Sequence, residues 1–167
     1  DKFNRKFKKI LKEIFISETQ FKSTKSLMAV RNCYNQPGKL GSDRWAQIVA
    51  THKIFKKNTM IVSCGSTISI DYVTATGIHK GGLILSGAER YNNCFLDIHN
   101  LKNIKLSNNN NKNNNSNILQ SNTLKQITMG YKVMISSSIN EIYSSLCQSG
   151  KPKPNLLITG SYSKNIS

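Results

Sequence analysis

Acidic residues are scarce in this sequence: its 167 residues hold 8 Asp and Glu against 24 Lys and Arg, a formal net charge of +16. A field of this sign attracts phosphates, nucleic acid or anionic lipid. The lysines are spread along the chain without an RNA-type aromatic motif. Lys and Asn are both heavily used and both have A/T-rich codons, so we favour codon drift with a general attraction to acidic substrates such as ATP over a nucleic-acid surface.

Paired cysteines and long apolar runs are also missing. The four cysteines form no CxxC pair and no zinc-ligand spacing, so we expect reduced thiols and no metal site. Cys64 follows no nearby His or Asp, which argues against a catalytic nucleophile. No segment approaches the roughly 20 apolar residues of a membrane-spanning helix, and no secretory signal is visible. We therefore expect a cytoplasmic protein without membrane contact. Because the chain begins at Asp1 rather than Met, we also expect a fragment or a processed product.

Apolar spacing in the first third of the chain predicts two helices and short strands. Residues 2–12 have the spacing of an amphipathic helix, and residues 14–17 and 27–30 are candidate strands. Ser42 is expected to cap the next helix. The inward face of that helix carries Trp45, Ile48, Val49 and His52.

The middle of the chain reads as an antiparallel sheet. Residues 59–64 and 68–73 are apolar strands separated by the turn Gly65-Ser66-Thr67, and residues 78–85 return after a hairpin turn at Thr76-Gly77. Strands joined this tightly must be antiparallel. Two successive glycines within the returning strand, Gly81-Gly82, indicate a bulge or a close backbone approach.

The last third contains a low-complexity segment between helical patterns. Residues 88–96 predict a helix, and the Asn-rich run 107–122 predicts a disordered surface insertion. Residues 123–148 predict one long helix or a broken pair. Residues 155–159 predict a buried strand that ends in a second hydroxyl-glycine turn.

Two features of residues 34–87 are typical of phosphoryl transfer, which needs positioning and charge neutralisation. Asp43 and Arg44 lie at a helix start, where a carboxylate can orient an alcohol and an arginine can bind a carboxylate with two hydrogen bonds. The Gly65-Ser66 turn can offer backbone N–H groups to phosphate. Taken alone, the first feature favours an ordinary ion pair and the second a plain turn. Asp71 is open between a solvent-facing strand residue and a wall of the site.

Four blocks, in order from about Tyr34 to the C-terminus, resemble the type III pantothenate kinases, also known as the Bvg accessory factor family. They are LGSDRW, SCGSTISIDYVTATGIHKGGLILSG, NTLKQITMGYKVMISSSINEI and LLITGS. The resemblance implies the α/β, ribonuclease-H-like fold of actin-like ATPases (ASKHA) and a homodimer. It also implies ATP-dependent phosphorylation of pantothenate to 4'-phosphopantothenate, the first step of coenzyme A biosynthesis, with magnesium and a monovalent cation, potassium or ammonium.

The resemblance also assigns roles to residues of this chain. Asp43 would be the general base on the pantothenate hydroxyl, and Arg44 would pair with the pantothenate carboxylate. The other pantothenate-binding positions would be Tyr34, Gly41, Ser42 and Thr123. The ATP-binding positions would be Gly65, Ser66, Thr159 and Gly160.

The sequence departs from the family pattern in three respects. It contains no Asp-x-Gly-Asn-Thr phosphate-binding strand, so we expect residues 1–33 to end an N-terminal half and residues 34–167 to form the C-terminal half. Ser63 stands where the family has a cation-binding Asp, which argues against the monovalent cation. Ser86 and Ser161 replace a family Pro and Gly. Two alternatives therefore stay open: a decayed or regulatory relative without turnover, and a basic nucleic-acid-binding accessory protein.

Overall fold

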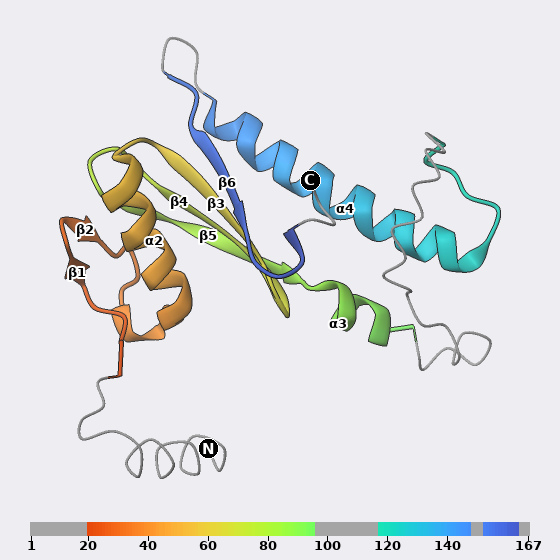
Figure 1. Ribbon diagram of the computed structural model, residues 1–167, viewed down its shortest axis with the longest axis horizontal. Coiled ribbons are helices and arrows are strands. Elements are labelled where there is room, and N and C mark those ends of the chain that lie inside the picture. The colour runs from red at the N-terminus through yellow and green to blue at the C-terminus, as the bar shows by residue number, and fades with distance from the viewer. Residues whose placement is uncertain (1–19, 96–116, 148–151, 164–167) are drawn as a thin grey trace.

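The computed structural model describes residues 20–95, 117–147 and 152–163. At its centre is a four-stranded sheet of strand order β5-β4-β3-β6 (Figure 1). Neighbouring strands are antiparallel except β3 and β6, which are parallel. The elements are β1 (Ser26–Leu27), β2 (Val30–Arg31), η1 (Pro37–Lys39), α2 (Ser42–Phe55), β3 (Thr59–Cys64), β4 (Thr67–Val73), β5 (His79–Ser86), α3 (Ala88–Asn93), α4 (Thr123–Leu146) and β6 (Asn155–Thr159). The mixed α/β class is confirmed, while the ribonuclease-H-like assignment stays a prediction.

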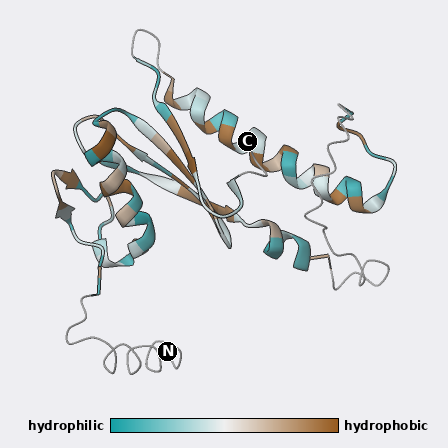
Figure 2. Cartoon of the chain, viewed as in Figure 1, coloured by the Kyte–Doolittle hydropathy of each residue, from teal (hydrophilic) through white to brown (hydrophobic). Residues whose placement is uncertain are grey.

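The sheet separates two apolar cores, because successive side chains of a strand point to opposite faces. On one face, α4 packs over β3 and β4, and the cluster includes Met60, Val62, Ile68, Ile70 and Ile135. On the other face, α2 and the β1–β2 hairpin pack against β3 and β4. The cluster there includes Val30, Trp45, Ile48, Ile61 and Val73. Figure 2 shows apolar residues alternating with polar ones along these elements. Residues of α2 and residues of α4 therefore reach different sides of the sheet.

Helix α4 is continuous, which decides between the long helix and the broken pair. Its buried positions recur every four residues, as one face of a helix requires. They are Ile127, Tyr131, Ile135 and Ile139. The side chain of Asn122 caps the helix by accepting a hydrogen bond from the Lys125 N–H at 3.2 Å.

Two local predictions were wrong. Residues 27–30 are not one strand: Met28 and Ala29, at φ 46° and 66°, form a tight turn between β1 and β2. Positive φ at both central residues gives the turn the twist that a two-residue hairpin needs. Ser42 is not a cap, because it is already the first residue of α2. The N-cap is Gly41, whose carbonyl accepts the Trp45 N–H at 2.9 Å.

The glycines of the β4–β5 hairpin behave as their sequence positions predict. Gly77 has φ +80° and donates its N–H to the Thr74 carbonyl at 2.9 Å. A Cβ on Gly82 would overlap the Ile70 carbonyl, and the register of the two strands shifts next to Tyr72. Both the close backbone approach and the irregularity are therefore present.

Some predictions fall outside the described residues: the helix over 2–12, the strand over 14–17 and most of the Asn-rich run. The hairpin before residue 33 shares an apolar core with α2, since Val30 is fully buried there. The division into two halves at residue 33 stays a prediction. Among the helices of the described ranges, none has the length and apolar character to cross a membrane.

Candidate functional site

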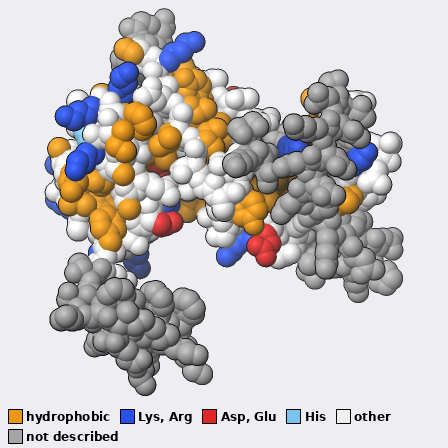
Figure 3. Space-filling view, in the orientation of Figure 1, with side chains coloured by type: hydrophobic (Ala, Val, Ile, Leu, Met, Phe, Trp, Pro, Cys, Tyr) orange, Lys and Arg blue, Asp and Glu red, His pale blue; other side chains and the backbone are white. Residues whose placement is uncertain are grey.

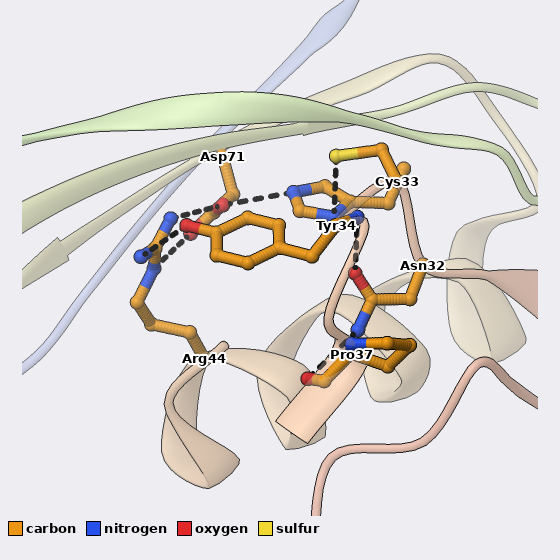
Figure 4. Close-up of polar contacts among 7 residues, drawn as sticks. Asn32, Cys33, Tyr34, Pro37, Arg44 and Asp71 are labelled. Carbon is orange, nitrogen blue, oxygen red and sulfur yellow. Dashed lines mark hydrogen bonds and ion pairs between the residues drawn. The ribbon is translucent and has the colours of Figure 1, made fainter. Parts of the chain in front are cut away.

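A buried ion pair joins the first turn of α2 to the middle of β4. Arg44 donates from Nε to Asp71 Oδ2 at 2.8 Å and from Nη2 to Asp71 Oδ1 at 2.7 Å (Figure 4). The two residues are 8% and 2% exposed, so both charges are largely removed from water. A bidentate pair satisfies the carboxylate and one edge of the guanidinium together. The pair therefore fixes the first turn of α2 against β4 through two hydrogen bonds.

Three further side chains complete what we call the Arg44 cluster: Tyr34, Cys33 and His79 beside Arg44 and Asp71. The His79 Nε2 lies 3.0 Å from Asp71 Oδ1, and its Nδ1 lies 3.5 Å from Cys33 Sγ. A carboxylate can only accept, so Nε2 carries the proton. Arg44 Nη1 donates to the Tyr34 hydroxyl at 3.4 Å, and the Tyr34 ring stacks on the His79 ring.

The loop before α2 holds Tyr34 in place. Its N–H donates to the Asn32 side-chain oxygen at 3.0 Å. The Asn32 amide in turn donates to the carbonyls of Thr24 and Pro37 at 3.2 and 3.4 Å. Asn32 is itself buried. The aromatic side of the cluster is thus set by backbone as well as by side chains, as the dashed lines of Figure 4 show.

The charges of the cluster stabilise one another. Burial alone would raise the pKa of Asp71, but hydrogen bonds from His79 and Arg44 and the positive charge of Arg44 outweigh it and lower that pKa below its ordinary value. The same hydrogen bonds to Asp71 raise the pKa of Arg44. Burial raises the pKa of the Cys33 thiol, so Cys33 is not an activated thiolate. The cluster therefore favours the ionised pair of Arg44 and Asp71.

Asp43 lies beside this cluster but faces solvent. Successive helical residues point about 100° apart, so Arg44 points to the sheet while Asp43 is exposed in the first turn. The Asp43 carboxylate folds back over Gly41: a Cβ there would lie 2.7 Å from Oδ1. Gly41 therefore leaves room for the carboxylate, and Ser42 is exposed next to it.

The predicted ATP-binding residues meet at one end of the sheet. β3 ends just before Gly65 and Ser66, and β6 ends at Thr159, which pairs with Ser63. A Cβ on Gly160 would overlap the Cys64 carbonyl, so this turn lies directly against the end of β3. The structure thus brings the two hydroxyl-glycine turns together.

One contact links the two groups of residues. Gln47 of α2 donates from Nε2 to the Ser63 Oγ at 3.2 Å. Ser63 pairs with Thr159 on one side and Ser69 on the other, so three hydroxyl side chains form a row on the α2 face. Along α2, Arg44 and Gln47 lie on one helical side. The start of α2 therefore covers the strand ends that lead into the turns.

Thr123 is not part of this arrangement. It is the first residue of α4, is exposed, and belongs to the helix on the opposite face of the sheet from α2 (Figure 1). The structure does not bring it to Arg44, and its pantothenate-binding role stays a prediction.

Comparison with known proteins decides the family. The sequence profile of the family described as Type III pantothenate kinase matches residues 1–145. The chain belongs to the type III pantothenate kinase family. Among curated members, a type III pantothenate kinase of Marinomonas sp. (strain MWYL1) is 45% identical over 58 residues, which are 35% of this chain and 24% of that one. The type III pantothenate kinase of Pseudomonas aeruginosa (strain LESB58) is 38% identical over 78 residues, 46% of this chain and 32% of that one.

The chain matches only part of the length of these relatives. The matched segments span about a quarter to a third of the length of these two relatives, by the 24% and 32% above. A crystal structure of a conserved Baf family protein from Campylobacter jejuni superposes with a TM-score of 0.51 at 20% identity, covering 82% of this chain and 56% of that chain. At that identity the likeness concerns the fold alone.

The resemblance predicts that Ser63 stands at a monovalent-cation position, and this correspondence stays a prediction. The residues around it do not fit that ion. The Ser63 hydroxyl accepts an amide N–H from Gln47, and the neighbouring hydroxyls of Ser69 and Thr159 bring no negative charge. Asp71, on the same face, is already neutralised by Arg44. In the part of the chain that the structure describes, no group of three His, Cys, Asp or Glu side chains gathers as a metal site.

Sequence reasoning missed part of the cluster. The sequence left two interpretations of Asp71, a solvent-facing strand residue or a wall of the site. The structure places it as a buried partner of Arg44. His79, Cys33 and Gln47 received no role. A usable signal was the alternation of β4: Ile68 and Ile70 line one core, so Asp71 had to face the helix that carries Arg44.

Proposed function

We propose that this chain contributes the pantothenate side of a kinase that transfers a phosphoryl group from ATP to pantothenate and forms 4'-phosphopantothenate. The observation that carries the proposal is the position of the start of α2. Arg44 reaches Asp71 and Gln47 reaches Ser63, so the first turns of α2 contact both the Arg44 cluster and the sheet end that holds Gly65 and Thr159. Acceptor and phosphate donor would meet there.

Arg44 supports a carboxylate site. Its Nε and Nη2 are engaged by Asp71, while Nη1 points to the Tyr34 hydroxyl. A guanidinium has five N–H donors, so the Nη1/Nη2 edge keeps donors for a second carboxylate. The Tyr34 hydroxyl adds a further donor beside it. We assign this edge to the carboxylate of pantothenate.

Asp43 supports the role of general base. It is exposed at the helix start, one residue from the arginine that would hold the substrate. Phosphoryl transfer needs a group that accepts the proton of the attacking hydroxyl and orients it in line with the phosphate. Gly41 and Ser42 lie at the same turn and would contact the substrate, Gly41 through its backbone and Ser42 through its hydroxyl or backbone.

The sheet end supports phosphate contacts. Gly65 and Ser66 form the turn between β3 and β4, where the Gly65 N–H donates to the Thr67 carbonyl at 3.0 Å and Ser66 is exposed, and Gly160 turns the chain at φ +102° after Thr159. Such turns expose backbone N–H groups to phosphate oxygens. Magnesium would come with ATP, as for phosphoryl transfer in general.

The test is a steady-state assay of pantothenate-dependent ADP release by this protein. Asp43→Asn is expected to lower kcat by about 100-fold or more without unfolding, because a positioned base contributes roughly that much. Glu89→Gln is the matched control, since Glu89 is also an exposed acid in the first turn of a helix. Its kcat should be unchanged.

Three outcomes would count against the proposal. No turnover in the wild-type protein would favour a decayed or regulatory relative. Equal kcat in the Asp43→Asn and Glu89→Gln variants would contradict the role of Asp43 as general base. Steeply salt-dependent duplex binding would favour the nucleic-acid alternative, although on the face of Figure 3 the Lys and Arg side chains are scattered among apolar ones. A homodimer and a cytoplasmic location stay predictions, which sedimentation and fractionation measure.

A further inference from the structure

We infer that Asp71, supported by His79, is a positioning residue that aims the free edge of Arg44 at the substrate carboxylate. This inference rests on the proposed function and adds to it two residues with no assigned role. Neither Asp71 nor His79 would touch the substrate: they are 2% and 0% exposed. Their effect would pass through Arg44.

The first step concerns which N–H groups of the Arg44 guanidinium are already hydrogen-bonded and which remain. Asp71 occupies Nε and Nη2 along one edge, at 2.8 and 2.7 Å. Because the guanidinium is planar and rigid, hydrogen bonds that fix one of its edges also fix the direction of the other edge. An arginine side chain without such a partner loses much conformational freedom when it binds a ligand, which weakens binding. Asp71 removes that cost before the substrate arrives.

The second step is the rigidity of Asp71 itself. It is in the central strand β4, paired with Ile61 of β3 and Gly82 of β5. A Cβ on Gly82 would lie 2.7 Å from Asp71 Oδ1, so the carboxylate lies flat against a strand that has no side chain at this point. The absence of a side chain at Gly82 thus makes space for the carboxylate.

The third step is the double role of His79. Its Nε2 donates to Asp71 Oδ1 at 3.0 Å, and its ring stacks on Tyr34 with centroids 6.2 Å apart and planes 17° apart. Asp71 and Tyr34, the two partners of Arg44, therefore both contact the fully buried imidazole of His79. His79 sets the carboxylate and the phenol relative to each other, and with them the direction of the arginine.

The first arm of the test needs no ligand. In the full chain, the Nε–H signal of Arg44 in a ¹⁵N NMR spectrum is assigned by its loss in Arg44→Lys. It should be protected from solvent exchange in the wild type and in Val73→Ala, a buried residue on the same face of β4 that belongs to the apolar core and makes no hydrogen bond to Arg44 through its side chain. In Asp71→Asn that protection should fall by about 10-fold or more. Equal protection in Asp71→Asn would overturn the inference.

The second arm compares two ligands by calorimetry: pantothenate and the alcohol in which its carboxylate is reduced to CH₂OH. Asp71→Asn should raise Kd for pantothenate by about 10-fold or more, as for loss of charge-assisted hydrogen bonds, and leave Kd for the alcohol within about twofold. Val73→Ala should change both ligands alike. His79→Phe, which keeps a ring against Tyr34, should show the same selectivity in weaker form.

The two arms separate the possible failures. Equal losses for both ligands in Asp71→Asn would mean a merely structural role and would overturn the inference. A wild-type chain that binds neither ligand contradicts the proposed function, while the NMR arm still decides whether Asp71 holds Arg44.

Discussion

Asp71 accepts hydrogen bonds from Arg44 on both of its carboxylate oxygens, at 2.8 and 2.7 Å, in the interior between α2 and the sheet. Desolvating two charges is costly, and a hydrophobic pair of the same shape is often as stable. The pair is therefore better explained by what it orients than by what it contributes to stability. Removing one partner alone, in contrast, leaves an uncompensated buried charge.

The first prediction concerns acid. The pKa of Asp71 is lower in the folded chain than its ordinary value of 3.8. Asp71 therefore binds a proton more readily in the unfolded chain than in the folded one. Its ionised form thus contributes to the free energy of unfolding, fully above its ordinary pKa, and this contribution disappears as pH falls through the folded pKa. The free energy of unfolding should decline less steeply below about pH 4 in Asp71→Asn than in the wild type. Urea titrations at several pH values measure the slope.

Glu141→Gln provides the comparison for that slope, because Glu141 is an exposed acid on α4 and appears in no ion pair of the described residues. The acid slope of this variant should match the wild type. An unchanged slope in Asp71→Asn would mean that the Arg44 pair does not govern acid stability.

The second prediction concerns the β4–β5 hairpin. Gly77→Ala should lower the free energy of unfolding by about 2 kcal/mol or more, since a side chain at positive φ is strained. Its φ is +80°, and the new Cβ would also overlap the Ala29 carbonyl, which belongs to the β1–β2 turn. Urea unfolding at neutral pH gives the value.

Gly38→Ala is the matched control, because a Cβ there meets nothing within 4 Å and no positive φ is involved. Its stability should stay within about 0.5 kcal/mol of the wild type. Similar losses in both variants would show that the turn accommodates a side chain and that the hairpin does not depend on Gly77.

Periodicity was sufficient for the sheet strands and the long helix of the described residues. The strands 59–64 and 155–159 and the long helix from Thr123 appear where apolar spacing predicts them. The hairpin at Met28-Ala29 was missed because its turn uses no glycine, so a positive-φ signal was absent from the sequence. Ser42 was misjudged as a cap because boundaries depend on which residue leaves helical geometry, which one residue type cannot tell.

The site was predictable where one segment held it and not where packing created it. Asp43 and Arg44 are neighbours in sequence, so their shared turn was visible. Arg44 and Asp71 are 27 residues apart, and Cys33 and His79 are 46 apart. Such pairs depend on strand register and on how α2 crosses the sheet, which no local spacing encodes. Residue type alone also did not predict that Arg44 is buried while Asp43 is exposed.

The last prediction concerns the monovalent cation. Ser63 offers one neutral hydroxyl, which already accepts the Gln47 amide, within a row of uncharged hydroxyl residues. A cation there would have no carboxylate to offset its charge, and the net charge of +16 opposes it further. Any kinase activity of this protein should therefore depend weakly on potassium. Ser63→Asp should create or sharpen a potassium requirement, because the added carboxylate lies beside the same sheet end.

The measurement is kcat/KM for ATP, with potassium chloride exchanged for choline chloride so that ionic strength and screening stay constant. Ser69→Asp is the matched control: it places a carboxylate on the adjacent strand, directly opposite Ser63 but outside the family's cation position. Potassium activation that appears in Ser63→Asp and not in Ser69→Asp assigns the requirement to position 63. If the wild-type protein already shows saturable activation equal to that of Ser63→Asp, the serine has not removed the cation and the charge argument is wrong.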